Sequence, residues 1–344
     1  MKSKSIVCIG IAIAILILFL CNLFYGSVSI PAPAVMDILF GKGSEKSAWV
    51  NIVLQSRLPQ AVTAMFAGAA LAVSGLMLQT LFQNPLAGPS ILGITNGANL
   101  GVAIVMLYSG GTIIVSRSDF SLGLNISVIL SAFIGAFLIL LLILYFSSRI
   151  KSNVLVLIVG MMVGYLTSSI ISVLNSYASA DNLRSYVVWG MGSFSGVQNA
   201  QLPLYSIMIG LGLFFSILLI KPMNALLLGE KYAANLGINV MQTRILILIT
   251  TGLLTAVVTA FCGPVSFIGL AVPHIARMVL GTSNQKLLLP ATILSGSAIA
   301  LLCNMMTVIP FGKGLLPLNA VTPILGAPVI IYVILNRKNR SYFN

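Results

Sequence analysis

The chain has 344 residues, of which 58% are hydrophobic and 7% are charged, with a mean hydropathy of +1.08 and a formal net charge of +13. Ordinary soluble domains contain roughly a quarter charged residues, so this composition excludes a soluble globular fold. It indicates an all-α polytopic membrane protein, because a membrane β-barrel would show short segments of alternating polarity instead.

Ten apolar runs predict about ten transmembrane helices packed in one bundle, and no shift in composition divides residues 1–344 into further domains. The first run lacks a convincing cleavage site and precedes nine others, so we interpret it as a span rather than a signal peptide. The eighth run is too short to cross a bilayer unaided and is expected to lie partly inside the bundle. The predicted spans are 5–25, 58–81, 91–108, 122–146, 154–174, 203–220, 245–261, 265–278, 288–308 and 321–335.

The fifth predicted span carries a row of polar residues at helical spacing. In this row Ser168, Ser172, Asn175, Ser176 and Ser179 follow one another at i, i+4, i+7, i+8 and i+11, which places them along one helical face. Such a face is typical of a helix that lines a water-filled passage. Hydrogen bonding between packed helices is the alternative interpretation, and the pattern leaves both open.

Residues 221–244, KPMNALLLGEKYAANLGINVMQTR, form the longest interior segment that is too polar to cross a membrane. Gly229 and Gly237 predict two short helical pieces, because Gly commonly follows a helix end. The segment has an apolar side that needs a surface to cover it, and we expect that surface to belong to another protein. The apolar residues are Leu226, Leu227, Leu228, Ala233, Ala234 and Leu236, and those expected to stay in water are Lys221, Glu230, Lys231, Asn235 and Arg244.

Basic residues predict the orientation, since Lys and Arg are enriched in cytoplasmic segments. With the N-terminus in the cytoplasm, the inner segments hold twelve Lys and Arg residues and the outer segments hold six. Both termini and residues 221–244 are therefore expected to be cytoplasmic. The positive net charge then reflects membrane topology, and nucleic acid is not expected as a partner.

The positions of the ionisable residues argue against chemistry performed by this chain alone. All five carboxylates fall in loops or at span ends, whereas proton-coupled carriers keep acidic or His relays within the bilayer. His274 is the single histidine and cannot bind a metal alone, and no nucleophile, phosphate loop or metal set appears. We therefore expect a non-catalytic chain driven by a separate ATPase. A secondary carrier that binds sodium through hydroxyls and carbonyls remains the alternative.

Four sequence blocks in order closely resemble the FecCD-type permease family, the membrane subunits of ABC importers for iron-siderophores, haem and vitamin B12. The resemblance covers nearly the whole chain. The blocks are RLPQAVTAMFAGAALAVSGLMLQTLFQNPLAGPSILGITNGANLG (57–101), WGMGSFSG (189–196), CGPVSFIGLAVPHIARMVLG (262–281) and TPILGAPVIIYVIL (322–335).

The resemblance implies a type II ABC importer permease fold in the bacterial cytoplasmic (inner) membrane. It implies a second permease copy or homologue, two cytoplasmic ATPase subunits that bind ATP-Mg, and an extracytoplasmic substrate-binding protein. No cofactor or metal is expected on this chain itself. An iron-siderophore is the first expected substrate, with haem or a corrinoid next.

Residue roles also follow from the resemblance. The stretch LLLGEKYAANLG matches the family's L-G-x-x-x-A-x-x-L-G segment, which docks into the ATPase; an amphipathic loop lying on the membrane is the alternative. The positions carried over to ATPase coupling are Leu228, Gly229, Glu230, Ala233, Leu236 and Gly237. The cytoplasmic gate is expected at Asn84, Leu86, Ser152 and Asn153.

Docking of the binding protein is expected at Arg57. The family usually has a second Arg where Gln60 stands and an Asp where Asn304 stands, so Arg57 is the outer arginine retained here, with Lys313 as a substitute for another. These departures put the docking chemistry in question and leave the expected fold unchanged.

Overall fold

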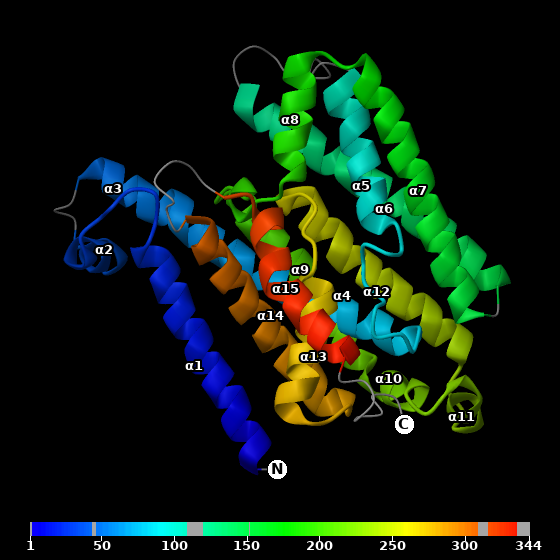
Figure 1. The fold of residues 1–344 in the computed structure, drawn as a ribbon. Coiled ribbons are helices and arrows are strands. Elements are labelled where there is room, and N and C mark those ends of the chain that lie inside the picture. The colour runs from blue at the N-terminus through cyan, green and yellow to red at the C-terminus, as the bar shows by residue number, and fades with distance from the viewer. Residues whose placement is uncertain (1, 43–45, 109–119, 151, 309–315, 336–344) are drawn as a thin grey trace.

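The computed structural model describes residues 2–42, 46–108, 120–150, 152–308 and 316–335, and all regular structure within these ranges is helical (Figure 1). Lys313 and several of the basic residues that indicated orientation lie outside them. The elements are α1 (Lys2–Phe24), α2 (Ala32–Leu39), α3 (Ser47–Asn51), η1 (Ile52–Arg57), α4 (Leu58–Leu81), α5 (Ile94–Ala103), η2 (Ile104–Tyr108), α6 (Phe120–Arg149), α7 (Asn153–Tyr177), α8 (Ala180–Gly190), η3 (Phe194–Gly196), α9 (Leu202–Leu218), α10 (Ile220–Leu226), α11 (Glu230–Asn235), α12 (Val240–Cys262), α13 (Ile268–Leu280), α14 (Gln285–Val308) and α15 (Leu318–Leu335).

Each of the ten predicted spans coincides with a helix, so the predicted all-helical membrane fold agrees with the structure. Seven described helices are long and apolar enough to cross a membrane alone, and α9 with α10, bent by 53°, makes an eighth. The third and eighth predicted spans correspond to shorter apolar helices, Ile94–Tyr108 and Ile268–Leu280. The expectation that the eighth span is too short to cross by itself is therefore confirmed.

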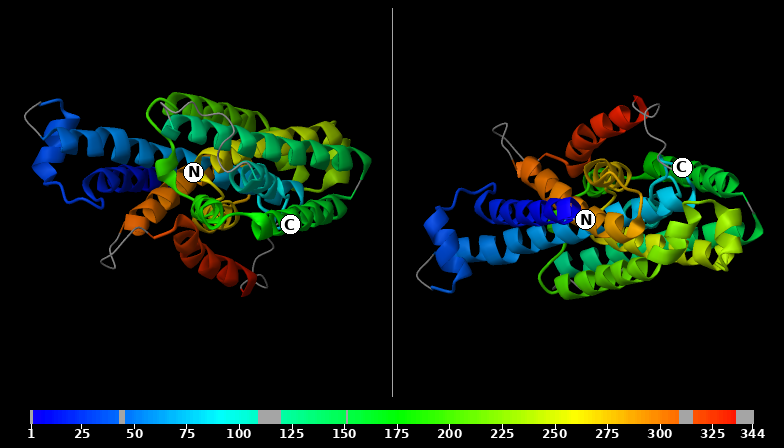
Figure 2. Two further views of the ribbon diagram at one scale, coloured as in Figure 1. Left: turned by 90° about the horizontal axis from the view of Figure 1, so that it is seen from above. Right: turned by 90° about the horizontal axis from the view of Figure 1, so that it is seen from below.

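Helix α4 lies at the centre of the bundle, where it packs against α9, α12, α13 and α14 (Figures 1 and 2). Its small residues allow these close approaches: a Cβ added to Gly68 would overlap the carbonyl oxygen of Gly296 in α14, and one added to Gly75 would overlap that of Gly269 in α13. Close backbone contact through small residues is a common means of helix association in membranes.

The peripheral helices leave two distinct ends. Helix α1 packs on α14, α15 packs on α13 and α14, and α5, α6 and α7 pack together on another side of α12 (Figure 2). The short helices α10 and α11 lie at the end that holds the start of α1, which we call the α11 end, and α2, α3 and α8 lie at the opposite α8 end (Figure 1).

The second span begins earlier than predicted. The helix runs without a break over Ser47–Leu81, 35 residues, and passes through a π-helical stretch at η1. Asn51, Gln55, Ser56 and Arg57 lower the hydropathy of its first part, which is why the apolar window opened only at Leu58. Hydropathy marks the membrane-embedded part of a helix and not its start.

Residues 221–244 form two short helices as predicted, but the segment ends sooner. Gly229 (φ +102°) precedes α11 and Gly237 (φ +81°) follows it, both in conformations that glycine adopts readily. Helix α12 begins at Val240 and therefore includes Arg244, which is 4% exposed. The expectation that Arg244 stays in water is wrong, and its contacts explain why.

Candidate functional site

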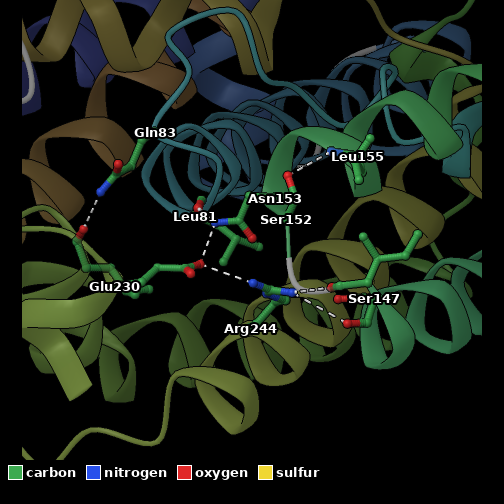
Figure 3. Close-up of polar contacts among 10 residues, drawn as sticks. Leu81, Gln83, Ser147, Ser152, Asn153, Leu155, Glu230 and Arg244 are labelled. Atoms are coloured by element: carbon green, nitrogen blue, oxygen red, sulfur yellow. Dashed lines mark hydrogen bonds and ion pairs between the residues drawn. The ribbon is translucent and has the colours of Figure 1, made fainter.

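The first residue of α11, Glu230, joins three helices at the α11 end (Figure 3). Its Oε1 atom accepts a hydrogen bond from Asn153 Nδ2 at 2.6 Å and from Arg244 Nη2 at 3.1 Å. We call Asn153, Glu230 and Arg244 the Glu230 cluster. Asn153 begins α7 and Arg244 lies in the first turns of α12, so the cluster ties α11 to the starts of two long helices.

The cluster extends to the ends of two further helices. Asn153 Nδ2 also donates to the carbonyl of Leu81, the last residue of α4, at 3.0 Å. Arg244 Nη1 donates to the carbonyls of Ile150 at 3.0 Å and Ser147 at 3.5 Å, where α6 ends. Five helix termini are therefore held by three side chains.

Burial makes the Glu230–Arg244 ion pair more than a surface contact. The Arg244 side chain is 5% exposed and that of Glu230 is 39% exposed. A buried guanidinium is costly without a counter-charge and hydrogen-bond acceptors, and the carboxylate with the carbonyls at the end of α6 supplies both. Glu230 is the one acidic residue of the sequence after Asp181. Arg244 therefore has no other carboxylate near it in the sequence with which it could pair.

Three large apolar side chains of α11 and its flanking turns are exposed, beside the polar Lys231 and Asn235. Leu228 is 63% exposed, Tyr232 is 52% exposed and Leu236 is 57% exposed. By contrast, Leu226 and Ala233 are buried against the bundle. The single apolar side expected from the sequence is thus divided: one part attaches the segment to this chain and the other faces away from it.

The break after α4 brings the remaining gate candidates to the same end. Asn84 Oδ1 accepts from the backbone N–H of Leu86 at 2.9 Å, which closes a tight turn. Gln83, at φ +46°, donates from Nε2 to the carbonyl of Leu226 in α10 at 2.8 Å (Figure 3). His274 Nε2 lies 2.7 Å from the carbonyl of Pro85, so this histidine of α13 is hydrogen-bonded to the turn that follows α4.

Three serines of the predicted polar row lie on α7 and face away from the rest of this chain, whereas Ser179 lies outside α7 and caps α8. Ser168, Ser172 and Ser176 are exposed, while Gly164, Thr167 and Ile171 form the buried face of the helix. The three serine hydroxyls donate to carbonyls one turn earlier in the same helix. Asn175 Oδ1 is buried and has no hydrogen-bond partner among the described residues. The three hydroxyls thus bond within their own helix, and their exposed face is available to water or to another helix.

Arg57 differs from what a docking residue requires. It is 6% exposed, and its guanidinium donates to the carbonyls of Leu23 and Phe24 at 2.8 and 2.9 Å and also to that of Val28. The C-terminal carbonyls of a helix carry partial negative charge, so the end of α1 attracts this cation. Its charge is therefore used inside the molecule, on the wall of a cavity of about 260 Å³ with mixed polar and apolar lining at the α8 end.

The two departures from the family pattern contact each other beside the same cavity. Gln60 Nε2 donates to Asn304 Oδ1 at 2.9 Å, and Asn304 Nδ2 donates to Asn22 Oδ1 at 2.7 Å. An uncharged amide pair thus stands where the resemblance led us to expect Arg and Asp. Among the described residues, no group of three His, Cys, Asp or Glu side chains could hold a metal ion.

Neither the contact made by Gln83 nor the burial of Arg244 was predicted from the sequence. The left-handed backbone of Gln83 is rare for a residue with a side chain and has no sequence signature. For Arg244 a signal existed, because a basic residue within reach of the lone inner carboxylate and next to an apolar run favours a buried ion pair.

Comparison with known proteins gives a family, sequence relatives and a solved structure. The model of the FecCD transport family matches residues 14–336. The vitamin B12 import system permease protein BtuC of Klebsiella pneumoniae subsp. pneumoniae is 34% identical over 332 residues, which cover 96% of this chain and 94% of the relative. The protein of the same name from Escherichia coli O9:H4 (strain HS) is 35% identical over 286 residues, 83% of this chain and 84% of the relative. The inward-facing conformation of a transporter assigned to the metal-chelate type of ABC transporters superposes with a TM-score of 0.82 at 28% identity, covering 97% of this chain and 99% of that one.

Proposed function

This chain belongs to the FecCD transport family, and from that membership we propose that it moves a bulky metal chelate into the bacterial cytoplasm. It is the multi-pass membrane permease subunit of an ABC importer, it is non-catalytic, and the ATPase is a separate chain. The family match over residues 14–336 is the observation that carries the proposal.

The uncovered apolar surface around α11 supports a docking site for a cytoplasmic ATPase that binds ATP-Mg. Leu228, Tyr232 and Leu236 expose more than half of their side chains at one end of the bundle. Exposed apolar groups that gather on one element favour a protein partner. Gly229 and Gly237 supply the positive φ angles that present this surface.

The excess of basic residues supports a cytoplasmic location for the α11 end and for both termini. At the α8 end, the cavity that Gln60 and Asn304 help to line supports docking of an extracytoplasmic binding protein. In that arrangement Arg57 acts by holding the end of α1 in place next to the docking surface. The face of α7 with Ser168, Ser172 and Ser176 would line a path shared with a second permease copy or a homologue.

An iron-siderophore is our first candidate substrate, with haem or a corrinoid next. Among these, the corrinoid vitamin B12 is favoured by a specific observation: the relatives at 34–35% identity are named as vitamin B12 import permeases. Serine hydroxyls and amides suit an intact chelate, whereas a bare hard cation would be bound by carboxylates. All five carboxylates of the sequence fall in loops or at the ends of predicted spans.

Reconstitution tests the proposal. The permease is placed in proteoliposomes with its cognate ATPase and binding protein, and uptake of a labelled ferric siderophore, haem and cyanocobalamin is measured with and without ATP. We expect ATP-dependent uptake of one of the three. Accumulation by the permease alone under a sodium or proton gradient would contradict the proposal and favour the secondary carrier.

A further inference from the structure

We propose that Glu230 acts inward, as the positioning residue that transmits movement of α11 to the gate at the start of α7, and that it is not a contact residue for the ATPase. The inference rests on the proposed function for its consequence in transport. Its structural basis, the Glu230 cluster, is independent of that function.

The carboxylate of Glu230 points into this chain and is already engaged there (Figure 3). One oxygen, Oε1, accepts from both Asn153 Nδ2 and Arg244 Nη2, at 2.6 and 3.1 Å. The neighbouring side chains of Leu228, Tyr232 and Leu236 are directed away from the bundle and are more than half exposed. The segment therefore separates two tasks: apolar side chains face outward, and the acidic one faces inward.

The cluster links α11 to the helix that begins beside the gate. Asn153 is the first residue of α7, next to Ser152, whose Oγ accepts from the backbone N–H of Leu155 at 3.5 Å and caps the helix. Asn153 also bonds the carbonyl of Leu81 at 3.0 Å, after which the chain enters the 84–89 turn. A shift of α11 that preserves the 2.6 Å contact must move the start of α7 with it.

The contacts are strong enough for that role. Hydrogen bonds that involve a charged partner are shorter and about twice as strong as neutral ones. Separation of Glu230 from Arg244 would leave a guanidinium that is 5% exposed without its counter-charge, which is unfavourable. Concerted movement of α11, α7 and α12 therefore costs less than movement of α11 alone.

A distance measurement on the permease alone tests the link without any ATPase. Spin labels are placed on cysteines substituted for Tyr232 in α11 and Val154 in α7, both exposed, in a background without the four native cysteines. The labelled full chain is diluted with unlabelled chain in lipid nanodiscs. Glu230→Gln and Asn153→Ala should broaden the distribution of distances between the labels, and Lys231→Gln, a change at an exposed neighbour, should not. An unchanged distribution in both cluster variants would overturn the link.

A swap of the two side chains distinguishes an inward role from contact with the ATPase. Asn153→Asp places a second carboxylate against Glu230, and the two negative charges repel each other. The amount of substrate transported per ATP hydrolysed should therefore fall by about tenfold or more, which is within the usual range for coupling between sites. Glu230→Gln should also lower this ratio while the ATPase still binds. The double variant Asn153→Asp with Glu230→Gln restores an amide–carboxylate pair and one negative charge beside Arg244. It should recover a large part of the ratio.

The outcomes separate the two proposals. Loss of ATPase binding in Glu230→Gln that the swap does not rescue would overturn the inward role and assign Glu230 to the ATPase interface. Equal loss of transport in both single variants and in the double variant, with unchanged unfolding temperatures, would also overturn it. If the unaltered permease binds no ATPase, the proposed function fails, and the distance measurement alone then decides whether the link exists.

Discussion

Asn153 and Glu230 are 77 positions apart in the sequence, and the amide nitrogen of one lies 2.6 Å from the carboxylate oxygen of the other. The contact joins the start of a long membrane helix to a short helix at the α11 end. Arg244 completes the arrangement from a third helix, α12. A polar contact of this kind, made where five helix termini meet, gives that end of the bundle a defined geometry.

Removal of the buried cation should destabilise this end of the protein. Arg244→Met keeps an unbranched apolar stem but removes the guanidinium, and with it the ion pair with Glu230 and the bonds to the carbonyls at the end of α6. A hydrogen bond to a charged group contributes about 1.5–3 kcal/mol, so we expect a loss of at least about 2 kcal/mol in unfolding free energy. The measurement is the midpoint of unfolding of purified protein in detergent.

Lys231→Met, at an exposed site on α11, is the matched control and should leave the midpoint within error. A midpoint for Arg244→Met equal to that of the control would show that the ion pair contributes nothing.

The crossing of α4 and α13 should not tolerate a methyl group. A Cβ on Gly75 would overlap the carbonyl oxygen of Gly269, and a backbone oxygen cannot rotate aside. Overpacking of this kind typically costs about 1–3 kcal/mol, so Gly75→Ala should lower the unfolding midpoint and the yield of folded protein. In α9, a Cβ on Gly210 meets no described atom within 4 Å, and Gly210→Ala should leave both unchanged or slightly raised. Similar behaviour of the two variants would contradict the close crossing.

The sequence was sufficient for the order of the apolar helices because most of them are apolar runs of about the length a bilayer requires, while Ile94–Tyr108 and Ile268–Leu280 are shorter. It was sufficient for the two short helices around Gly229 and Gly237 because glycine commonly follows a helix end. Helices α2 and α8 were not predicted, since neither carries a long apolar run. Helix α2 is held by the packing of Ala34, Val35 and Ile38, and α8 begins after Ser179, whose side chain caps it; local hydropathy measures neither.

The polar contacts could not be predicted, since they depend on which helix ends meet. Asn319, the second residue of α15, is an example. In the structure its amide donates to the carbonyls of Pro264 and Gly190 at 2.7 and 3.1 Å and accepts from the backbone of Ser266 at 3.0 Å. Arg57 was assigned to docking from its place in a motif, while its burial depends on the end of α1, more than thirty positions away. Motif position indicates that a residue matters, but its contacts decide how.

The exposed apolar surface next to α11 should be required for ATPase binding and dispensable for folding. Leu236→Asp replaces an apolar side chain that is 57% exposed, so the unfolding midpoint should change little. Burial of a leucine side chain contributes about 1.5–3 kcal/mol, so affinity for the ATPase should fall by about tenfold or more.

Asn235→Asp adds the same charge at the adjacent exposed position of α11 and is the matched control. Binding should be measured with purified components at two salt concentrations, since an effect of charge alone weakens at high salt. Equal losses in the two variants would show that charge, and not the apolar contact, explains the result.

The two interpretations of the α7 row differ in how accessible it is to water during transport. A cysteine reacts with a charged thiol reagent only where water reaches it, because the thiolate is the reactive form and does not persist in lipid. Ser172→Cys, in a background without the native cysteines, should therefore be labelled by a membrane-impermeant methanethiosulfonate while the importer turns over. Leu166→Cys is the control: Leu166 is 62% exposed in the isolated chain, but it lies about 120° around the helix from Ser172. If the row lines the path, Ser172→Cys reacts at least about tenfold faster than Leu166→Cys, since the thiolate fraction controls the rate. If both cysteines stay unlabelled while transport continues, the serines serve helix packing instead. The hydrogen bonds that Ser168 and Ser172 donate to carbonyls one turn earlier then satisfy their hydroxyl groups without water.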